Sequence, residues 1–299
     1  MPAHDELGIR MKENYEKIPK TRLMRRTPAI VRVDGKAFHT FAKGLIKPFD
    51  EVLSLSMKET AKFLCENVMN CRLAYVQSDE ISLLLTDYET LTSQAFFDYE
   101  VQKVCSVTAS MATLAFNKAF ATHARACAEY MRSELPYTDL TKRGVAARKY
   151  GVPEDPNFRV DYKIVLDEAV RKGAMFDSRF FNLPKEEVAN YFYWRQLDAS
   201  RNSVQMVGQA NFTQKELHGK SCSKIQDMLH EEKGINWNDL PTDKKRGACC
   251  VRREVQASTV DAKDGAVVRH VWTIDDEIPI FKGEGREYVE RFVYADDER

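Results

Sequence analysis

The sequence predicts an α+β fold built on a split β-α-β-β-α-β sheet, with the helices of that unit on one face. Short β-branched runs alternate with longer segments in which apolar residues recur every three or four positions. Two of the short runs, 73–77 and 81–86, are separated by only three polar residues, a spacing typical of a hairpin. Strand, helix, hairpin and helix in this order supply five of the six parts of the split arrangement.

Each element of this unit has its own local signal. Residues 29–33 are rich in β-branched side chains and stop at Asp34-Gly35, a pair typical of a strand end followed by a tight turn. Asp50 precedes a run with helical spacing. The elements expected in chain order are a strand at 29–33, a helix at 51–69, strands at 73–77 and 81–86, a helix at 99–121 and a closing strand at 174–182.

The rest of the chain is expected to flank this unit. Residues 122–173 are charged and interrupted by prolines, and we interpret them as a helical insertion that delays the closing strand. Beyond Pro184 the spacing is again helical, and the chain ends in a β-rich tail. The further elements expected are a helix at 185–212, two helices signalled by the capping-box pairs Thr213/Glu216 and Ser223/Gln226, and strands at 251–255 and 267–274.

Composition describes a globular protein without net charge. The 299 residues include 45 basic and 45 acidic side chains, and 43% are hydrophobic. Zero net charge excludes a generally cationic nucleic-acid coat, although residues 10–26 hold seven basic and only two acidic side chains. The seven cysteines form no CxxC pair, and residues 1–10 lack the apolar core of a signal peptide. We therefore expect a cytoplasmic protein that does not associate with membranes.

These patterns suggest three regions. We expect residues 1–28 to form a basic N-terminal segment and residues 29–183 to form the split β-α-β-β-α-β domain with the insertion 122–173. Residues 184–299 form a helical and β-rich region that packs on that unit.

Two acidic turns are the strongest chemical signal. In a split βαβ unit the first two strands run parallel and the hairpin strand runs antiparallel to both, so the end of the first strand and the hairpin share one edge of the sheet. Asp34 and Asp79 are then expected to lie a few ångströms apart. Mg²⁺ prefers one or two carboxylates together with carbonyls, waters and phosphates, and the Gly35 carbonyl is a further ligand candidate. Taken singly, each turn is more often ordinary turn chemistry than a ligand.

Other catalytic chemistries find little support. The six histidines have no HExxH spacing, and the chain holds no Gly-x-Ser-x-Gly elbow. Gly219-Lys220-Ser221 has the last three letters of a Walker loop, but no glycine stands five positions ahead. Paired carboxylates holding two Mg²⁺ ions instead favour displacement at phosphorus, that is, nucleotidyl transfer.

Five stretches carry a resemblance to a known family. They are Arg32–Phe41 (RVDGKAFHTF), Lys47–Asp50 (KPFD), Gln77–Ser82 (QSDEIS), Phe176–Arg179 (FDSR) and Trp194–Ala199 (WRQLDA). In this order they resemble the tRNA-histidine guanylyltransferase superfamily, whose members have a polymerase palm-like domain and add nucleotides to RNA in the 3′-to-5′ direction. The resemblance covers most of the chain and is weakest in residues 122–173.

The resemblance implies roles for particular residues. The catalytic residues would be Asp34 and Asp79, and with Gly35 they would hold two Mg²⁺ ions. Glu80 is a further candidate, although a hairpin glutamate is usually just solvated. The residues implied in holding nucleoside triphosphates such as ATP and GTP are Gly35, Lys36, Ala37, Phe38, His39, Lys47, Ser78 and Lys103. The rings of Phe38 and His39 are included in that implied nucleotide site.

The branch and the partners follow from finer features. Where eukaryotic tRNA-histidine enzymes carry a His-Ile-Asn-Asn-type run, this chain has Ser200–Gln205 (SRNSVQ). That difference is similar to the guanylyltransferase-like branch, which repairs truncated tRNA 5′ ends by templated addition. Arg201 and Asn202 are candidates for RNA contact, and the family implies a homotetramer. Three alternatives stay open: histidine-tRNA-specific G addition, a palm-type nucleotide cyclase, and a non-catalytic RNA-binding module with exposed aromatic residues on the central strands.

Overall fold

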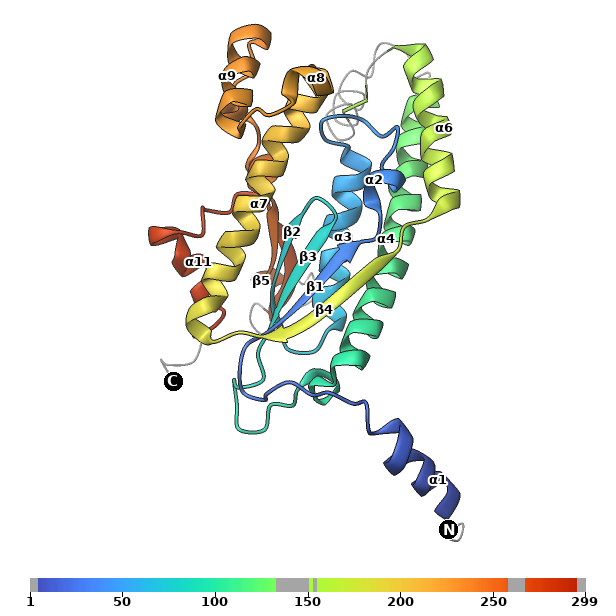
Figure 1. The fold of residues 1–299 in the computed structure, drawn as a ribbon, viewed down its shortest axis with the longest axis vertical. Helices are drawn as coiled ribbons and strands as arrows, with labels where there is room; N and C mark the ends of the chain where they lie inside the picture. The colour runs from blue at the N-terminus through green and yellow to red at the C-terminus, as the bar shows by residue number, and fades with distance from the viewer. Residues whose placement is uncertain (1–4, 133–150, 153–154, 258–266, 295–299) are drawn as a thin grey trace.

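The computed structural model describes residues 5–132, 151–152, 155–257 and 267–294, and it has the α+β architecture that the sequence predicts (Figure 1). None of the helices in these ranges is both long enough and apolar enough to cross a lipid bilayer. The helices are α1 (Glu6–Met11), α2 (Phe38–Phe41), α3 (Glu51–Asn67), α4 (Val101–Arg132), α6 (Pro156–Lys172), α7 (Lys185–Asn211), α8 (Gln214–Leu217), α9 (Cys222–Lys233), α10 (Thr242–Arg246) and α11 (Glu287–Glu290). The strands are β1 (Ala29–Gly35), β2 (Cys71–Gln77), β3 (Glu80–Leu85), β4 (Phe176–Asn182), β5 (Ala248–Ala257) and β6 (Val267–Asp275).

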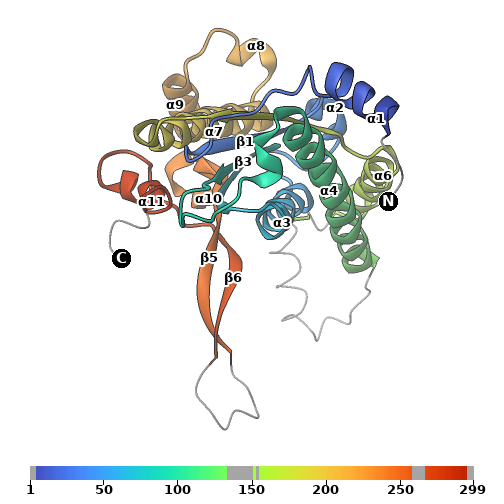
Figure 2. The same cartoon turned by 90° about the horizontal axis from the view of Figure 1, so that it is seen from below.

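The described strands form one six-stranded sheet in the order β4-β1-β3-β2-β5-β6. Every neighbouring pair is antiparallel, so β1 and β2 run parallel on either side of β3. This confirms the split β-α-β-β-α-β arrangement, with β4 as the closing strand beside β1. β5 extends the same sheet because residues 248–250 pair with β2. From Cys249 onward β5 also pairs with β6, and the two strands project from the body of the molecule (Figure 2).

Helices α3 and α4 cover one face of the sheet, and α6 packs against α4 (Figure 1). Alternate strand residues such as Val31 and Leu83 point into this layer and are fully buried. Their neighbours include Leu64 of α3 and Phe116 of α4. Phe38 joins them, with its ring centroid 5.6 Å from that of Phe116.

Helices α7 and α11 lie on the opposite face, so the sheet is covered on both sides. The strand residues that point this way include Ile30 and Tyr75. Tyr75 is fully buried, with its ring 6.3 Å from Phe192 and 5.8 Å from Phe281. The aromatic residue of the central strands that an RNA-binding module would expose is therefore inside the core.

The described part of residues 122–173 is helical, as the sequence predicts, and it packs with the helices of the sheet-forming unit. Helix α4 continues through residue 132, and residues 156–172 form α6, which packs against α4 and whose side chains Tyr162 and Leu166 are buried in the same core. Pro156 begins this helix, with Asp155 as the cap that accepts a hydrogen bond from Asn157 N. A proline at the first helical position costs no hydrogen bond, so here it starts a helix rather than interrupting one. Residues 133–150 lie outside the described part of the chain.

One of the two predicted capping boxes is correct. Thr213 and Glu216 cap each other at the start of α8, with both reciprocal hydrogen bonds present. The second prediction is wrong by two residues, because α9 is capped by Ser221, whose hydroxyl accepts from Lys224 N at 3.2 Å. Ser223 lies inside the first turn, and spacing alone does not separate two serines so close together.

The structure of α6 leads to a stability prediction. Leu166 is 1% exposed whereas Ile164, on the same helix, is 51% exposed. We expect Leu166→Ala to lower the free energy of unfolding by about 2–5 kcal/mol, because it leaves a cavity in the core. Ile164→Ala is the matched control and should change that free energy by less than about 0.5 kcal/mol. Chemical denaturation measures both, and equal losses would show that α6 does not belong to the core.

Candidate active site

The two acidic turns lie side by side at one edge of the sheet. Asp34 is the register partner of Glu80 in the β1–β3 ladder, and Glu80 follows Asp79 directly. The backbone N–H of Gly35 donates to the Asp79 carbonyl at 3.1 Å. The structure thus brings together the end of the first strand and the hairpin, as the topology predicts. Asp34 and Asp79 are both partly exposed to solvent.

Glycine is required at position 35 by this close approach. A Cβ built on Gly35 would lie 2.9 Å from Asp79 Oδ2 and would overlap the ring of Phe38. Any side chain here would push the Asp79 carboxylate away or displace a core aromatic. The absence of a side chain leaves the carboxylate next to the backbone of β1.

The two carboxylates differ in how their charge is balanced. Arg179 Nη1 lies 3.3 Å from Asp34 Oδ2 and also 3.3 Å from Asp177 Oδ1. Among the ion pairs of the described residues, none includes Asp79. Burial raises the pKa of the Asp79 carboxyl to about 6, and the negative charge of Asp34 adds to the rise, although hydrogen bonds from its own backbone and from Ser78 oppose it. A cation beside Asp79 would remove this penalty.

The oxygen donors of Asp34, Asp79 and Gly35 are of the kind that Mg²⁺ prefers. Within residues 5–132, 151–152, 155–257 and 267–294, no group of three or more His, Cys, Asp and Glu side chains is arranged to hold a metal ion. The donors that the acidic turns offer are two carboxylates and the Gly35 carbonyl, all hard oxygen atoms. Mg²⁺ is commonly held by one or two carboxylates, with waters and substrate phosphates completing its shell.

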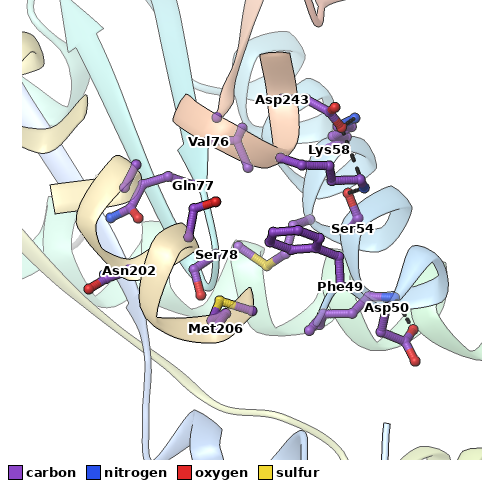
Figure 3. Close-up of a pocket in the computed structure, with 16 residues that line it drawn as sticks. Phe49, Asp50, Ser54, Lys58, Val76, Gln77, Ser78, Asn202, Met206 and Asp243 are labelled. Carbon is purple, nitrogen blue, oxygen red and sulfur yellow. Dashed lines mark hydrogen bonds and ion pairs between the residues drawn. The ribbon is translucent and has the colours of Figure 1, made fainter. Parts of the chain in front are cut away.

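A pocket of about 110 Å³ opens beside the hairpin. Figure 3 shows Ser78, Asn202 and Met206 on one side of it, with Phe49 and Lys58 on the other. Lys58 Nζ is neutralised by Asp243 Oδ2 at 2.7 Å, so the floor carries little free charge. The predicted residues Ser78 and Asn202 therefore line one pocket next to the acidic turns, and its walls combine apolar and hydrogen-bonding groups.

The other residues predicted to bind the nucleotide differ in their exposure to solvent. Lys36, Ala37 and His39 are exposed directly after the acidic turn, and the N–H of Lys36 donates to Met175 O at 2.8 Å. The ring of Phe38 is not available to a nucleotide because it is buried in the core.

The two predicted lysines lie apart from each other. Lys47 lines a second hollow with Gln205, Gln209 and His218. Lys103 lies near the start of α4, 4.7 Å above the ring of Phe97. Figure 1 shows α4 beginning at the end of the sheet away from the β2–β3 turn. Within the described chain, Lys103 therefore does not join the acidic turns.

The expectation that Glu80 is solvated is wrong. Its side chain is buried on the α7 face and accepts two hydrogen bonds of 2.7 Å from Arg195 Nε and Nη2. Arg195 also lies 3.0 Å from Asp198 Oδ2, which in turn pairs with Arg201. Sequence reasoning did not assign a role to Arg195 or Asp198, and the only signal for them is their i, i+3 spacing in the WRQLDA stretch.

Comparison with known proteins agrees with this geometry. The family model described as "Thg1: tRNAHis guanylyltransferase" matches residues 9–184, more than half of the chain. The chain belongs to the Thg1 family. It is therefore a nucleotidyltransferase, and the family resemblance read from the sequence is confirmed.

Two solved structures and one curated relative are similar to this Thg1-family chain over most of its length. A bacterial Thg1-like protein in complex with ATP is 40% identical, with a TM-score of 0.71, and the match covers 97% of this chain and all of that one. The same kind of protein in complex with GTP is 39% identical, with a TM-score of 0.69, at the same coverage. The tRNA(His) guanylyltransferase of Saccharomyces cerevisiae is 26% identical over 75% of this chain and 82% of its own.

The raised pKa of Asp79 predicts a pH-dependent stability difference. The folded-state pKa of about 6 exceeds the unfolded value of about 3.9, so the wild type loses stability as pH rises from about 4 to 6, by at most about 2–3 kcal/mol. Without Mg²⁺, Asp79→Asn should therefore be more stable than the wild type at pH 7.5 and similar to it at pH 4. Chemical denaturation at both pH values measures this.

Added Mg²⁺ and a matched variant serve as controls for the stability difference between the wild type and Asp79→Asn. Added Mg²⁺ should stabilise the wild type at pH 7.5 and leave Asp79→Asn unchanged. Asp161→Asn makes the same chemical change on the exposed face of α6 and should follow the wild type. Parallel pH profiles for the wild type and Asp79→Asn would refute the electrostatic account.

The buried Glu80–Arg195 pair makes a second prediction. Arg195→Met leaves the Glu80 carboxylate buried without its partner and should cost about 3–5 kcal/mol of unfolding free energy. Adding Glu80→Gln to that variant should recover part of the loss because the unpaired charge disappears. A double-mutant cycle from denaturation data gives the coupling between the two residues. Additive losses would mean that the two side chains do not depend on each other.

Proposed function

We propose that this chain adds nucleotides in the 3′-to-5′ direction to the 5′ end of tRNA, by a reaction that uses two Mg²⁺ ions and repairs truncated ends on a template. The observation that carries the proposal is the meeting of Asp34, Gly35 and Asp79 beside the pocket lined by Ser78 and Asn202. Solved relatives bound to ATP and to GTP support nucleoside triphosphates as its substrates.

Two successive displacements at phosphorus make up the proposed reaction. The 5′-phosphate of the tRNA attacks the α-phosphorus of ATP or GTP, releasing pyrophosphate and leaving an activated 5′ end. The 3′-hydroxyl of an incoming nucleoside triphosphate then attacks that 5′ phosphorus, and the nucleoside monophosphate leaves. Bound Mg²⁺ would supply charge neutralisation for the triphosphate.

The chain's own residues contribute positioning and charge. Asp34 and Asp79 hold two negative charges at a fixed separation, and Gly35 leaves room beside them. Ser78 offers a hydroxyl at the mouth of the neighbouring pocket, and Lys47 offers a positive charge from the adjacent segment. Preorganised groups of this kind contribute most of the rate in phosphoryl transfer.

Contacts with tRNA are proposed on the α7 side of the site. Asn202 lines the pocket and is one turn from Asp198, whereas Arg201 is 60% exposed and pairs with Asp198. An exposed arginine held by a single carboxylate keeps donors free for phosphate. The Ser200–Gln205 sequence favours repair over strict histidine-tRNA specificity. A homotetramer in the cytoplasm completes the proposal on family grounds.

The alternative functions have less support. A palm-type nucleotide cyclase shares paired carboxylates but needs no RNA, and the matching family model is that of a tRNA-modifying enzyme. Addition of a single G to histidine tRNA is the alternative within the family, and the choice of tRNA separates it from repair.

A truncated tRNA tests the proposed function. Purified protein with Mg²⁺, ATP and labelled GTP should extend a tRNA that lacks its first 5′ nucleotide to a full acceptor stem when the 3′ partner is C, and then stop. Asp79→Ala should abolish this addition, by removing a metal ligand, while tRNA affinity measured by filter binding stays within about twofold. Addition to every 3′ partner alike would argue against templating, and full activity of Asp79→Ala would exclude the metal-site model.

A further inference from the structure

Helix α6 contacts α2 and the segment that joins α2 to α3 at three points. Lys172 Nζ donates to Thr40 O at 2.9 Å, and the Tyr162 hydroxyl donates to Asp50 Oδ2 at 2.7 Å. Between these two bonds, Gly44 packs against α6 so closely that an added Cβ would lie 3.0 Å from Val165. Residues 162, 165 and 172 belong to one side of the helix, so α6 follows the segment over most of its length.

Asp50 is the centre of this contact. The residue is 5% exposed, and its carboxylate accepts hydrogen bonds from Ile46 N at 2.9 Å and Leu53 N at 3.0 Å, in addition to Tyr162. The bond to Ile46 closes the turn that precedes Lys47, and the bond to Leu53 caps α3. One buried carboxylate thus fixes the end of the segment to two helices at once.

The segment so fixed lies between the two hollows of the active-site region. Lys47 lines the hollow formed with α7, α8 and α9, and Phe49 lines the pocket beside Ser78. Residues 42–50 have no regular helix or strand structure. Holding such residues in one conformation costs about 1–2 kcal/mol each in backbone entropy. Contacts from a neighbouring helix offset that cost before a ligand arrives.

We propose that Tyr162 is a positioning residue that, through Asp50, keeps residues 42–50 in the conformation that binds the nucleoside triphosphate. This inference rests on the proposed function. Tyr162 acts on the nucleotide through the segment and has no direct role in the displacement. Loss of its hydroxyl lets the segment sample other conformations, so binding of the nucleotide must then order it. Such a change weakens binding of the substrate and of the transition state equally, so KM rises and kcat stays unchanged.

Tyr162→Phe tests the inference because it removes one hydroxyl and keeps the ring. The KM for GTP in the truncated-tRNA assay should rise about tenfold, equivalent to ~1.4 kcal/mol. The Kd for a non-reactive GTP analogue, measured in the presence of Mg²⁺, should rise by the same factor. The kcat value should stay within about twofold. Lys172→Met, an exposed residue whose loss does not open the core, should raise the same two constants in the same direction.

Tyr288→Phe is the matched control, since its hydroxyl donates to Asp275 Oδ2 at 2.8 Å on the other face of the sheet. It should lower the melting temperature about as much as Tyr162→Phe and leave KM and Kd unchanged. Unchanged Kd in Tyr162→Phe, with a melting temperature that falls as in the control, would overturn the inference and leave a purely structural hydrogen bond. A wild type that binds the analogue and extends no tRNA would refute the proposed function, and the Kd comparison would still decide the role of Tyr162.

Discussion

The antiparallel pairing of β1 with β3 is the constraint on which the site depends. Val33 and Ile81 are register partners, and both are fully buried toward α3 and α4. Side chains alternate along a strand, so a shift of the strand register by one residue would move such core residues to the opposite face of the sheet and would move Asp34 to the face covered by α3 and α4. The apolar core therefore fixes the position of Asp34, and the two-residue turn after β2 fixes Asp79 beside it. The geometry of the two carboxylates is a consequence of packing on the opposite face of the sheet.

Local signals predicted the elements that local chemistry determines. The strands, the acidic turns and the meeting of Asp34 with Asp79 follow from β-branched runs and from the order of elements. The helical character of residues 122–173 was predicted, but the start of α6 at Pro156 was not. A proline can begin a helix or break one, and one sequence does not show which residues pack beyond it. The position of Lys103 could not be predicted for a related reason. Helical spacing places a residue on one face of a helix, but it does not show which end of the 32-residue helix α4 lies at the site.

The role of Glu80 depends on a contact that the sequence around it does not contain. Its partner Arg195 is 115 residues away in α7, which covers the face of the sheet opposite α3 and α4. Alternation along β3 sends Glu80 and Ser82 to that same face, where Ser82 meets the hydroxyl of Tyr191 at 2.8 Å. A hairpin glutamate without such a helix over it is solvated, so the fold decides between the two outcomes.

Two buried carboxylates near the site are stabilised by different chemistry, and the difference follows from their neighbours. Burial raises the pKa of Asp50 at the start of α3, and hydrogen bonds from the Tyr162 hydroxyl and two backbone N–H groups oppose that rise, together with the helix dipole. Glu80 adjoins Asp34 and Asp79, so a neutral donor would leave a further unpaired negative charge beside them, and Arg195 supplies a full positive charge instead. With Glu80 paired, the charge that remains unbalanced is concentrated on Asp79. The fold thus keeps one carboxylate open to a cation while it neutralises the adjacent ones.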